Sequence, residues 1–284
     1  MDQESEDLFS QIVNELYMAD ANYAIIGTDF ELDLQGSSSS KYDNAKRPLF
    51  SFFNEELLER PTYKTFLALM DNYISGTGQN EELNREEVQE NIDFINAITE
   101  TDLMNKFFDL LVEKELFDGD YNGLKRKMYT IWFRLYSRNY ESRREGILDS
   151  SAFEHTFVGE VKNTGSPMGF HNWLRLYTLE KAGELDYEGH VRKAERNIMA
   201  QVRFNWQGCD KVSSIFLGTS PEFEMAVYSL ALVFAKKFEL EEVKIPFEIE
   251  GEQYAIQVYN KYKWSEKHQC KKIQLESAFP TAEF

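Results

Sequence analysis

The stretch FEHTFVGEVKNTGSPMGFHNWLRLY, residues 153–177, holds two of the four histidines in this chain of 284 residues. His155 and His171 each lie among aromatic and glycine residues, and a Gly-Ser-Pro sequence at residues 165–167 separates them. Such a sequence is typical of a turn that reverses the chain. Two histidines so placed raise the question of a shared site, and the segments on either side of this stretch decide the fold class.

Upstream of this stretch, apolar residues recur at helical spacing. They do so at residues 8–17, behind an acidic start, and in the segments 54–74, 85–117 and 121–138. The segment 35–48 contains four consecutive serines and ends in a proline, which predicts a loop. The first half of the chain is therefore expected to be mostly helical.

The pattern changes downstream. The polar segment 138–151 predicts a connection. Beyond it we expect strands at 156–161, 199–206, 214–217, 244–249 and 254–259, and helices at 172–181 and 221–237. Strands mixed with helices without regular alternation predict an α+β fold. The predicted division is a helical, acidic amino-terminal lobe at residues 1–139 and a β-rich lobe at residues 140–284.

Charge is distributed unevenly along the chain. The net charge is −18, but residues 1–120 carry 8 basic and 27 acidic side chains, whereas residues 121–284 carry 23 and 22. The second part can therefore meet a phosphate backbone through local basic clusters. Lys125-Arg126-Lys127 and Arg143-Arg144 are two such clusters, and they are equally compatible with solvated helix faces.

Several classes of protein and site are excluded or disfavoured. The longest apolar run, residues 225–235, is too short for a membrane span. The amino terminus lacks the features of a signal peptide, which predicts a cytoplasmic protein, or a secreted one if a signal peptide has been removed. Cys209 and Cys270 form no disulfide framework and are expected to be free thiols. P-loop, GxGxxG, HExxH and GxSxG patterns are absent.

Two histidines at one site can divide the work of acid and base. With an ordinary pKa of roughly 6.5, one imidazole can accept a proton while the other donates one. RNA cleavage needs such a pair, together with a cation for the charge that grows on the phosphate. A zinc site built from His155, His171 and Cys209 is the alternative, but its spacing matches no common zinc pattern.

Three motifs carry a family resemblance. FEHTFVGE, GFHNW and FNWQGCDKVSSIFLGTSPEFEMAVYSL resemble the successive motifs of the EndoU family of uridylate-specific endoribonucleases. DNYISGTG and IWFRLYSR also resemble the amino-terminal half of its eukaryotic members, so the resemblance covers nearly the whole chain. It implies a helical amino-terminal lobe followed by a catalytic lobe of antiparallel sheets with flanking helices.

The resemblance also implies the reaction and its residues. The family's catalytic histidines and lysine correspond to His155, His171 and Lys211. The implied substrate is single-stranded, uridine-containing RNA, cleaved by transesterification to leave a 2′,3′-cyclic phosphate and a 5′-hydroxyl. Viral relatives suggest His171 as the base and His155 as the acid.

This chain departs from the family pattern at two places. The step from the lysine to the serine that reads uracil is one residue shorter, so Ser214 is the predicted uracil contact and Ser213 the alternative. Near the carboxyl end, Ser277-Ala278-Phe279-Pro280 replaces the usual Thr-Ala-Tyr-Pro. Ser277 can still form a hydrogen bond and Phe279 can still stack on a base, but any role of the tyrosine hydroxyl is lost.

Other residues in or near these motifs have less specific predictions. Three acids can orient catalytic groups, bind a metal or form structural hydrogen bonds: Glu160, Glu222 and Glu224. Two tryptophans are expected to pack the lobe and two histidines to lie at the surface: Trp173, Trp206, His190 and His268.

The resemblance finally implies activation by manganese or calcium, without a metal in the cleavage chemistry itself. The acidic first part of the chain favours ions bound by carboxylates away from the catalytic groups, although a merely solvated acidic face is the alternative. The metal ligands are not predicted. A monomer is expected, and the alternative function is an RNA-binding protein of the same fold without turnover.

Overall fold

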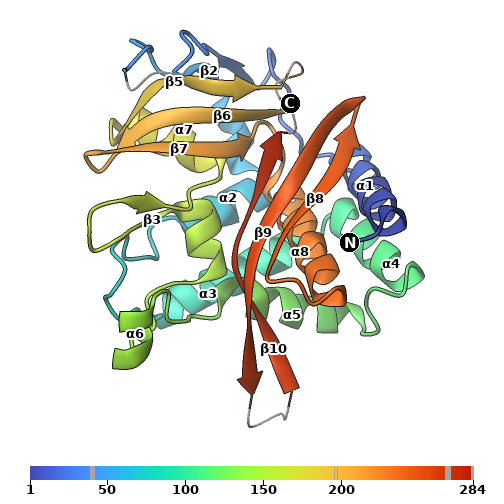
Figure 1. Ribbon diagram of the computed structural model, residues 1–284. Helices are drawn as coiled ribbons and strands as arrows, with labels where there is room; N and C mark the ends of the chain where they lie inside the picture. Colours follow the sequence, from blue (N-terminus) through green and yellow to red (C-terminus); the bar gives the residue numbers. More distant parts are fainter. Residues whose placement is uncertain (39–41, 195, 197, 266–269, 283–284) are drawn as a thin grey trace.

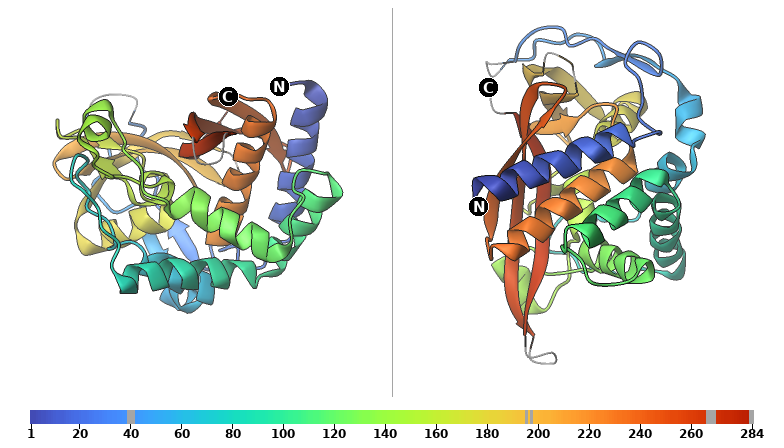
Figure 2. Two further views of the ribbon diagram at one scale, coloured as in Figure 1. Left: turned by 90° about the horizontal axis from the view of Figure 1, so that it is seen from below. Right: turned by 90° about the vertical axis from the view of Figure 1, so that its right-hand side faces the viewer.

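The computed structural model describes residues 1–38, 42–194, 196, 198–265 and 270–282 (Figure 1, Figure 2). As predicted, helices dominate its first half: α1 (Gln3–Met18), η1 (Glu55–Glu59), α2 (Pro61–Ala68), α3 (Arg85–Thr99), α4 (Asp102–Glu113) and α5 (Tyr121–Phe133). Five of these helices begin directly after a short polar residue whose side chain accepts a hydrogen bond from the first turn: Asp2, Asn54, Asn84, Thr101 and Asp120.

One hairpin in the first half was not predicted. β1 (Phe30–Leu32) pairs antiparallel with β2 (Phe50–Phe53), and the described part of the predicted loop between them contains no helix or extended strand. Phenylalanines of both strands pack around the buried ring of Trp173. The hairpin therefore contributes to the core although its strands are short.

The second half contains two three-stranded antiparallel sheets, which confirms the α+β class. The strand orders are β5–β6–β7 and β8–β9–β10. Their bounds are β5 (Leu185–Lys193), β6 (Met199–Trp206), β7 (Cys209–Phe216), β8 (Glu242–Ile249), β9 (Glu252–Ser265) and β10 (Cys270–Ala282). β3 (Glu160–Val161) and β4 (Pro167–Met168) form a small hairpin. The helices are α6 (Tyr140–Glu145), α7 (Trp173–Ala182) and α8 (Pro221–Lys237). β5, β10 and α6 were not predicted.

The predicted strand at residues 156–161 is wrong over most of its length. Glu154–Val158 forms a short π-helix, η2, and only Glu160–Val161 is a strand. Thr, Phe and Val favour strands by residue type. However, Phe153 and Phe157 lie four residues apart, which places them on the same side of a helix. Both enter the aromatic core, so tertiary packing overrides the local preference.

α8 lies at the centre of the fold. Of its 17 residues, 14 are buried, so almost its whole circumference is covered. α1, α2 and α4 pack against it together with β9 and β10, and Figure 2 shows α1 and α8 side by side. The hydrophobic core is thus continuous across residue 139, while the lobe boundary itself stays a prediction. No helix in the described ranges, α8 included, is long and apolar enough to cross a membrane.

The edges of the two sheets meet beside the stretch that contains the histidines. β7 is the edge of one sheet and β10 the edge of the other, and the two strands pack together (Figure 1). η2 packs against β10, and β4 packs against β7. This junction therefore gathers side chains from both sheets and from residues 153–177.

Candidate active site

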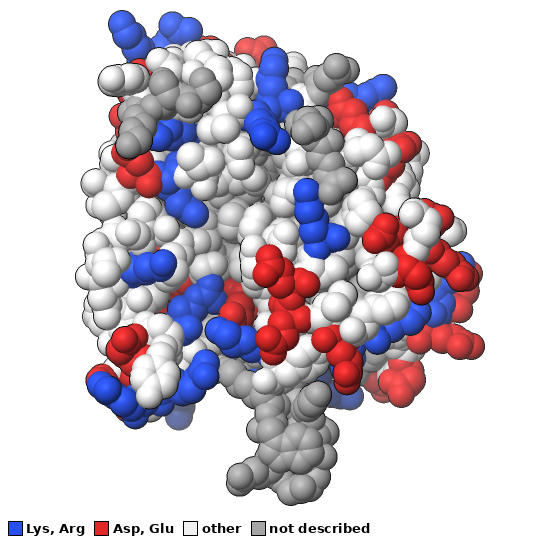
Figure 3. All heavy atoms as spheres, in the orientation of Figure 1, with Lys and Arg blue, Asp and Glu red and all other residues white. Residues whose placement is uncertain are grey.

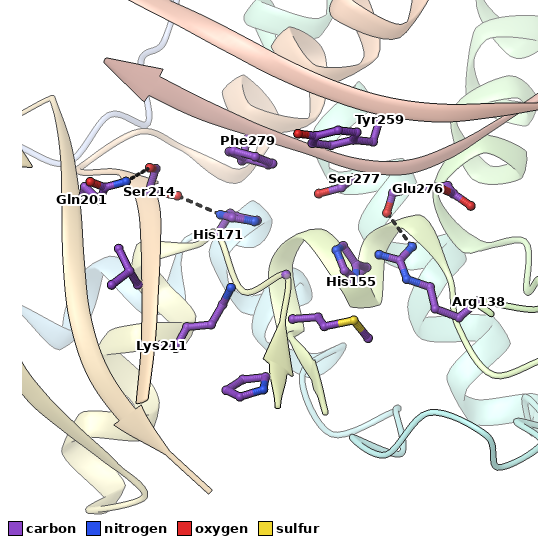
Figure 4. Close-up of a pocket in the computed structure, with 14 residues that line it drawn as sticks. Arg138, His155, His171, Gln201, Lys211, Ser214, Tyr259, Glu276, Ser277 and Phe279 are labelled. Atoms are coloured by element: carbon purple, nitrogen blue, oxygen red, sulfur yellow. Dashed lines mark hydrogen bonds between the residues drawn. The ribbon is translucent and has the colours of Figure 1, made fainter. Parts of the chain in front are cut away.

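A cavity of about 490 Å³ lies at the junction of the two sheets (Figure 4). All six predicted site residues line it: His155, His171, Lys211, Ser214, Ser277 and Phe279. They come from η2, the segment after β4, β7 and β10. The fold therefore brings together residues up to 124 positions apart in the sequence, from His155 to Phe279, although their roles stay predictions.

Backbone hydrogen bonds fix the two histidines beside each other. The β3–β4 hairpin reverses the chain, and the N–H of Phe170 then donates to the carbonyl of His155 at 3.0 Å. The N–H of His171 donates to the carbonyl of Thr156 at 2.7 Å. Gly169 makes this approach possible, since its φ is +61° and a Cβ there would lie 1.7 Å from the His155 carbonyl oxygen.

His155 is oriented by a buried carboxylate. Its Nδ1 contacts Oε2 of Glu160, and the same oxygen lies 3.4 Å from Nε of Arg138. Burial alone would raise the pKa of Glu160, but His155 and Arg138 hold it below its ordinary value. A charged carboxylate beside Nδ1 fixes the proton on that nitrogen and leaves Nε2 for the cavity. Glu160 therefore orients the His155 ring, and the catalytic role of that ring stays a prediction.

The hydrogen bonds of His171 define its tautomer. Its Nδ1 lies 3.1 Å from the carbonyl oxygen of Ser214 and 2.9 Å from Oγ of Ser213. The Ser213 hydroxyl donates to the carbonyl of Phe170 at 2.6 Å, and a carbonyl oxygen can only accept, so Nδ1 must carry the proton. Nε2 is then unprotonated on the opposite side of the ring. Phe279 stacks on this ring, with centroids 4.2 Å apart.

Lys211 projects from β7 into the space between the two histidines (Figure 4). No ion pair or hydrogen bond joins its ammonium group to another residue in the described part of the chain. Burial, together with the charge of Lys162, lowers the pKa of Lys211 to about 8. The group is therefore charged at neutral pH and available to an incoming anion.

Both imidazoles are neutral before a substrate enters. Burial and the neighbouring guanidinium of Arg138 lower the pKa of His155 to about 4. Burial and the Lys211 ammonium lower the pKa of His171 well below its ordinary value. A phosphate in the cavity would supply the negative charge that favours the protonated imidazole, and it would therefore raise both pKa values.

The serines occupy different positions. The side chain of Ser214 lines the cavity, where Nε2 of Gln201 lies 3.4 Å from its hydroxyl. Ser213 lies behind His171 and bonds to the backbone, so only Ser214 faces a ligand. Ser277 lines the opposite wall, and its buried hydroxyl has no hydrogen-bond partner among the described residues. Both Ser214 and Ser277 can therefore donate to a substrate.

Sequence reasoning missed several residues that line the cavity, among them Arg138, Gln201 and Tyr259. Arg138 ends the motif IWFRLYSR, so the motif could have revealed it. Its guanidinium also donates to the Glu276 carbonyl at 2.9 Å. Gln201 lies opposite Ser214 on β6, and Tyr259 lies opposite Ser277 on β9. Strand pairing places Gln201 and Tyr259 in the cavity lining, and no local sequence pattern identifies them as site residues.

The remaining predictions have mixed outcomes. Trp173 and Trp206 are buried in the core, as predicted. His190 is only half-buried, and its Nδ1 lies 3.0 Å from the Leu34 carbonyl. Cys209 is a free thiol. His268 and the side chain of Cys270 lie outside the described residues.

Two glutamates of the SPEFE motif form structural hydrogen bonds away from the cavity. Glu224 accepts from Asn172 at 3.2 Å and from Thr219 at 3.0 Å. Because Asn172 caps α7 directly after His171, this network supports the loop that carries the base candidate. Glu222 accepts from Asn22, which links α8 to the segment after α1.

Three buried carboxylates behind His155 are the candidate ligands for the expected metal ion. Glu81, Glu154 and Glu160 each keep one oxygen without a hydrogen-bond partner in the described ranges. Burial and the neighbouring carboxylates raise the pKa of Glu81 to about 7 and that of Glu154 well above its ordinary value. However, no group of three or more His, Cys, Asp or Glu among the described residues is arranged to hold a metal. These residues therefore offer no preformed divalent-ion site.

The surface charge favours an anionic ligand at the cavity. Figure 3 shows Lys and Arg side chains on both sides of the hollow between the sheets, whereas Asp and Glu gather at the right-hand edge of this face and in one group beside the lower part of the hollow. Arg138 and Lys211 are the basic residues in the lining itself. The two basic clusters singled out in the sequence lie on α5 and α6 and do not line the cavity.

The chain is similar to several known proteins over nearly its whole length. Residues 8–280 match the family model described as Endoribonuclease XendoU. Poly(U)-specific endoribonuclease-A of Xenopus laevis is 40% identical over 265 residues, which cover 88% of this chain and 87% of that protein. Uridylate-specific endoribonuclease B of Danio rerio is 36% identical over 270 residues, covering 90% and 93%. The solved structure described as "The structure of XendoU: a splicing independent snoRNA processing endoribonuclease" has a TM-score of 0.81 and 34% identity, and covers 100% of this chain and 98% of that chain.

Proposed function

Because the chain belongs to the XendoU family of endoribonucleases and is an RNA-cleaving enzyme, we propose that it cuts single-stranded RNA at uridines by transesterification. The sequence resemblance to this family is thereby confirmed. The observation that carries the proposal is the meeting of two oriented imidazoles and a free ammonium group in one cavity. Acid, base and charge stabilisation are the three functions that this reaction requires.

In the proposed reaction His171 is the base. Its Nδ1 proton is committed to protein acceptors, so Nε2 takes the proton of the uridine 2′-hydroxyl. The 2′-oxygen forms a bond to the adjacent phosphorus while the bond to the departing 5′-oxygen breaks. The products are a 2′,3′-cyclic phosphate and a 5′-hydroxyl end.

His155 is then the acid. The substrate phosphate raises its pKa, and the Glu160 carboxylate at Nδ1 stabilises the imidazolium that forms. The Nε2 proton of His155 passes to the departing 5′-oxygen. Lys211 meets the charge that grows on the non-bridging phosphate oxygens during the reaction.

Uridine preference rests on the wall that carries Ser214. This hydroxyl faces the cavity, whereas Ser213 is committed to the backbone, which favours Ser214 as the contact to uracil. Ser277 supplies a second hydroxyl and Phe279 an aromatic ring in the same cavity. The relatives named for uridylate and poly(U) specificity support this choice of base.

A substrate with one 2′-deoxyuridine tests the reaction. An oligonucleotide with a single uridine should be cut, and its 2′-deoxyuridine version should resist because the nucleophile is missing. The products should end in a cyclic phosphate with or without added metal. Efficient cutting of the deoxy substrate, or a direct 3′-hydroxyl product, would contradict the mechanism. A protein that binds both oligonucleotides and cuts neither would be the non-catalytic alternative.

We further propose that manganese or calcium activates the enzyme from outside the cleavage chemistry. The family resemblance and the acidic first part of the chain support this, although the described residues offer no preformed site. Calorimetry with each ion on the RNA-free protein tests it. Absence of binding at sub-millimolar concentration would leave only screening of the RNA charge. The monomeric state and the cellular compartment stay predictions.

A further inference from the structure

A second, smaller cavity continues from the catalytic one. Its volume is about 240 Å³, and its lining consists of Arg192, Met199, Gln201, Ser214, Thr281 and Ala282. Gln201 and Ser214 line both cavities, so the two spaces share one wall. A ligand that contacts Ser214 in the first cavity can therefore extend into the second.

Strand pairing arranges three of these residues in a row. Arg192 on β5 pairs with Gln201 on β6, and Gln201 pairs with Ser214 on β7. Directly paired residues of an antiparallel sheet point to the same face. The row therefore crosses the sheet from Ser214 to Arg192 over two strand spacings, roughly 10 Å. That is the scale of the distance from the base of a nucleotide to a phosphate of the same nucleotide.

The far end of the row has the chemistry of a phosphate site. Arg192 is exposed, and no ion pair or hydrogen bond joins its guanidinium to another described residue. Thr281, on the neighbouring end of β10, has a buried hydroxyl without a hydrogen-bond partner among the described residues. A guanidinium presents several donors in a fixed fork that suits phosphate oxygens. Apart from these donors the lining is neutral, with Met199 as a buried apolar residue.

The order of groups along RNA fixes the direction. In the proposed function, the scissile phosphate lies on the 3′ side of the uridine, next to His155, His171 and Lys211. Ser214 contacts the base of that nucleotide. The phosphate on the other side of the same nucleotide is the 5′ one, and Arg192 lies beyond Ser214 on the side away from the catalytic groups.

We propose that the second cavity binds the 5′-phosphate of the cleaved uridine, with the Arg192 guanidinium and the Thr281 hydroxyl as its ligands. This inference rests on the proposed function, because it uses the uridine position to assign the direction. It makes the enzyme recognise a nucleotide with both of its phosphates, and so favours uridines inside a strand over one at a free 5′-hydroxyl end.

Two dinucleotides that differ in one phosphate test the proposal: UpA and 5′-phosphorylated pUpA. Wild-type enzyme should cleave pUpA with a kcat/KM about 3–5-fold higher at low salt, the usual worth of one exposed ion pair, and the advantage should shrink as salt rises. Arg192→Ala should abolish this advantage and leave the cleavage of UpA unchanged. Unchanged UpA cleavage also shows that the variant is folded.

Lys193→Ala is the matched control. Lys193 is the next residue on β5, is exposed and carries the same charge, but alternation directs its side chain to the other face. This variant should keep the preference for pUpA. A phosphate added to the 3′ end, as in UpAp, should have an effect that Arg192→Ala does not change.

Three results would overturn the proposal. They are an Arg192→Ala variant that keeps the pUpA preference, an equal loss in both Arg192→Ala and Lys193→Ala, or a response to UpAp instead of pUpA. If the wild type cleaves no uridine dinucleotide or oligonucleotide at all, the proposed function itself fails, and the 5′-phosphate assignment fails with it. That outcome is distinct from normal cleavage without a phosphate effect.

Discussion

The charge of Lys211 should set the alkaline limit of the reaction. Burial and Lys162 lower its pKa to about 8, and the proposed role requires the ammonium form. The group would be about nine-tenths charged at pH 7 and about one-tenth charged at pH 9, so loss of this charge should by itself lower kcat/KM about tenfold over this interval. The sign follows from the role: activity is present below the pKa and is lost as the pH rises through it.

The measurement is kcat/KM for a single-uridine oligonucleotide between pH 6.5 and 9.5, because this ratio reports the free enzyme before a phosphate raises the pKa. Lys211→Arg keeps its charge throughout this range. It should therefore have a lower rate at pH 7 and should lack the additional tenfold fall in kcat/KM that loss of the ammonium charge causes in the wild type. Lys162→Gln should move the limb to higher pH, since it removes the neighbouring positive charge.

The Lys211→Arg variant also controls for ionisation of the substrate, because such ionisation would affect the wild type and the variant equally. A wild-type profile that stays flat to pH 9.5 would refute the reasoning. So would a Lys211→Arg variant with the same alkaline limb, because the titrating group would then lie elsewhere.

The remaining predictions concern the groups around the histidines. Glu160→Gln should lower kcat by about 10²–10⁴-fold with little change in KM, because His155 loses the carboxylate that orients it. Steady-state kinetics on a folded variant checks this, and a normal kcat would contradict it. Gly169→Ala should lower both the melting temperature and the activity, since its Cβ collides with the backbone, whereas Gly183→Ala, with open space around its Cβ, should retain activity. Ser214→Ala should reduce the preference for uridine over cytidine, while Ser213→Ala should lower the rate without changing that preference; competing uridine and cytidine substrates distinguish the two.

The local sequence pattern predicted both ends of some helices and strands correctly. The helix at 221–237 begins with Pro221 after the capping residue Ser220, and its apolar composition marks a buried element. The strand at 199–206 alternates buried and partly exposed residues along most of its length. In both cases the local preference and the tertiary environment agree, which is why sequence alone suffices.

Other elements depend on contacts that no local pattern shows. Residues 270–282 form the edge strand β10, but one proline, two lysines and one glutamate interrupt their apolar residues, so the periodicity is weak. The segment around Thr156 has strand-forming residue types, yet its aromatic neighbours place it in a π-helix. Both assignments follow from packing against distant parts of the chain.

In the candidate site, too, some residues could be predicted from local sequence and others could not. The motifs predicted His155, His171, Lys211, Ser214, Ser277 and Phe279, and all six line one cavity. Gln201 and Tyr259 enter that cavity only because of the register of their strands. A motif identifies residues with recognisable chemistry, whereas the residues that complete the walls are chosen by geometry.

The arrangement of charges explains how one cavity can hold a base and an acid with similar surroundings. Burial, together with the charges of Arg138 and Lys211, lowers the pKa of both imidazoles and keeps them neutral in the empty cavity, which suits His171 as a base. Only His155 has a carboxylate at Nδ1; the acceptors at His171 are a carbonyl and a hydroxyl, which carry no charge. When a phosphate offsets the cations, the imidazolium is therefore better stabilised at His155 than at His171. The substrate and Glu160 together would then assign the acid to His155 and leave His171 free to accept the proton.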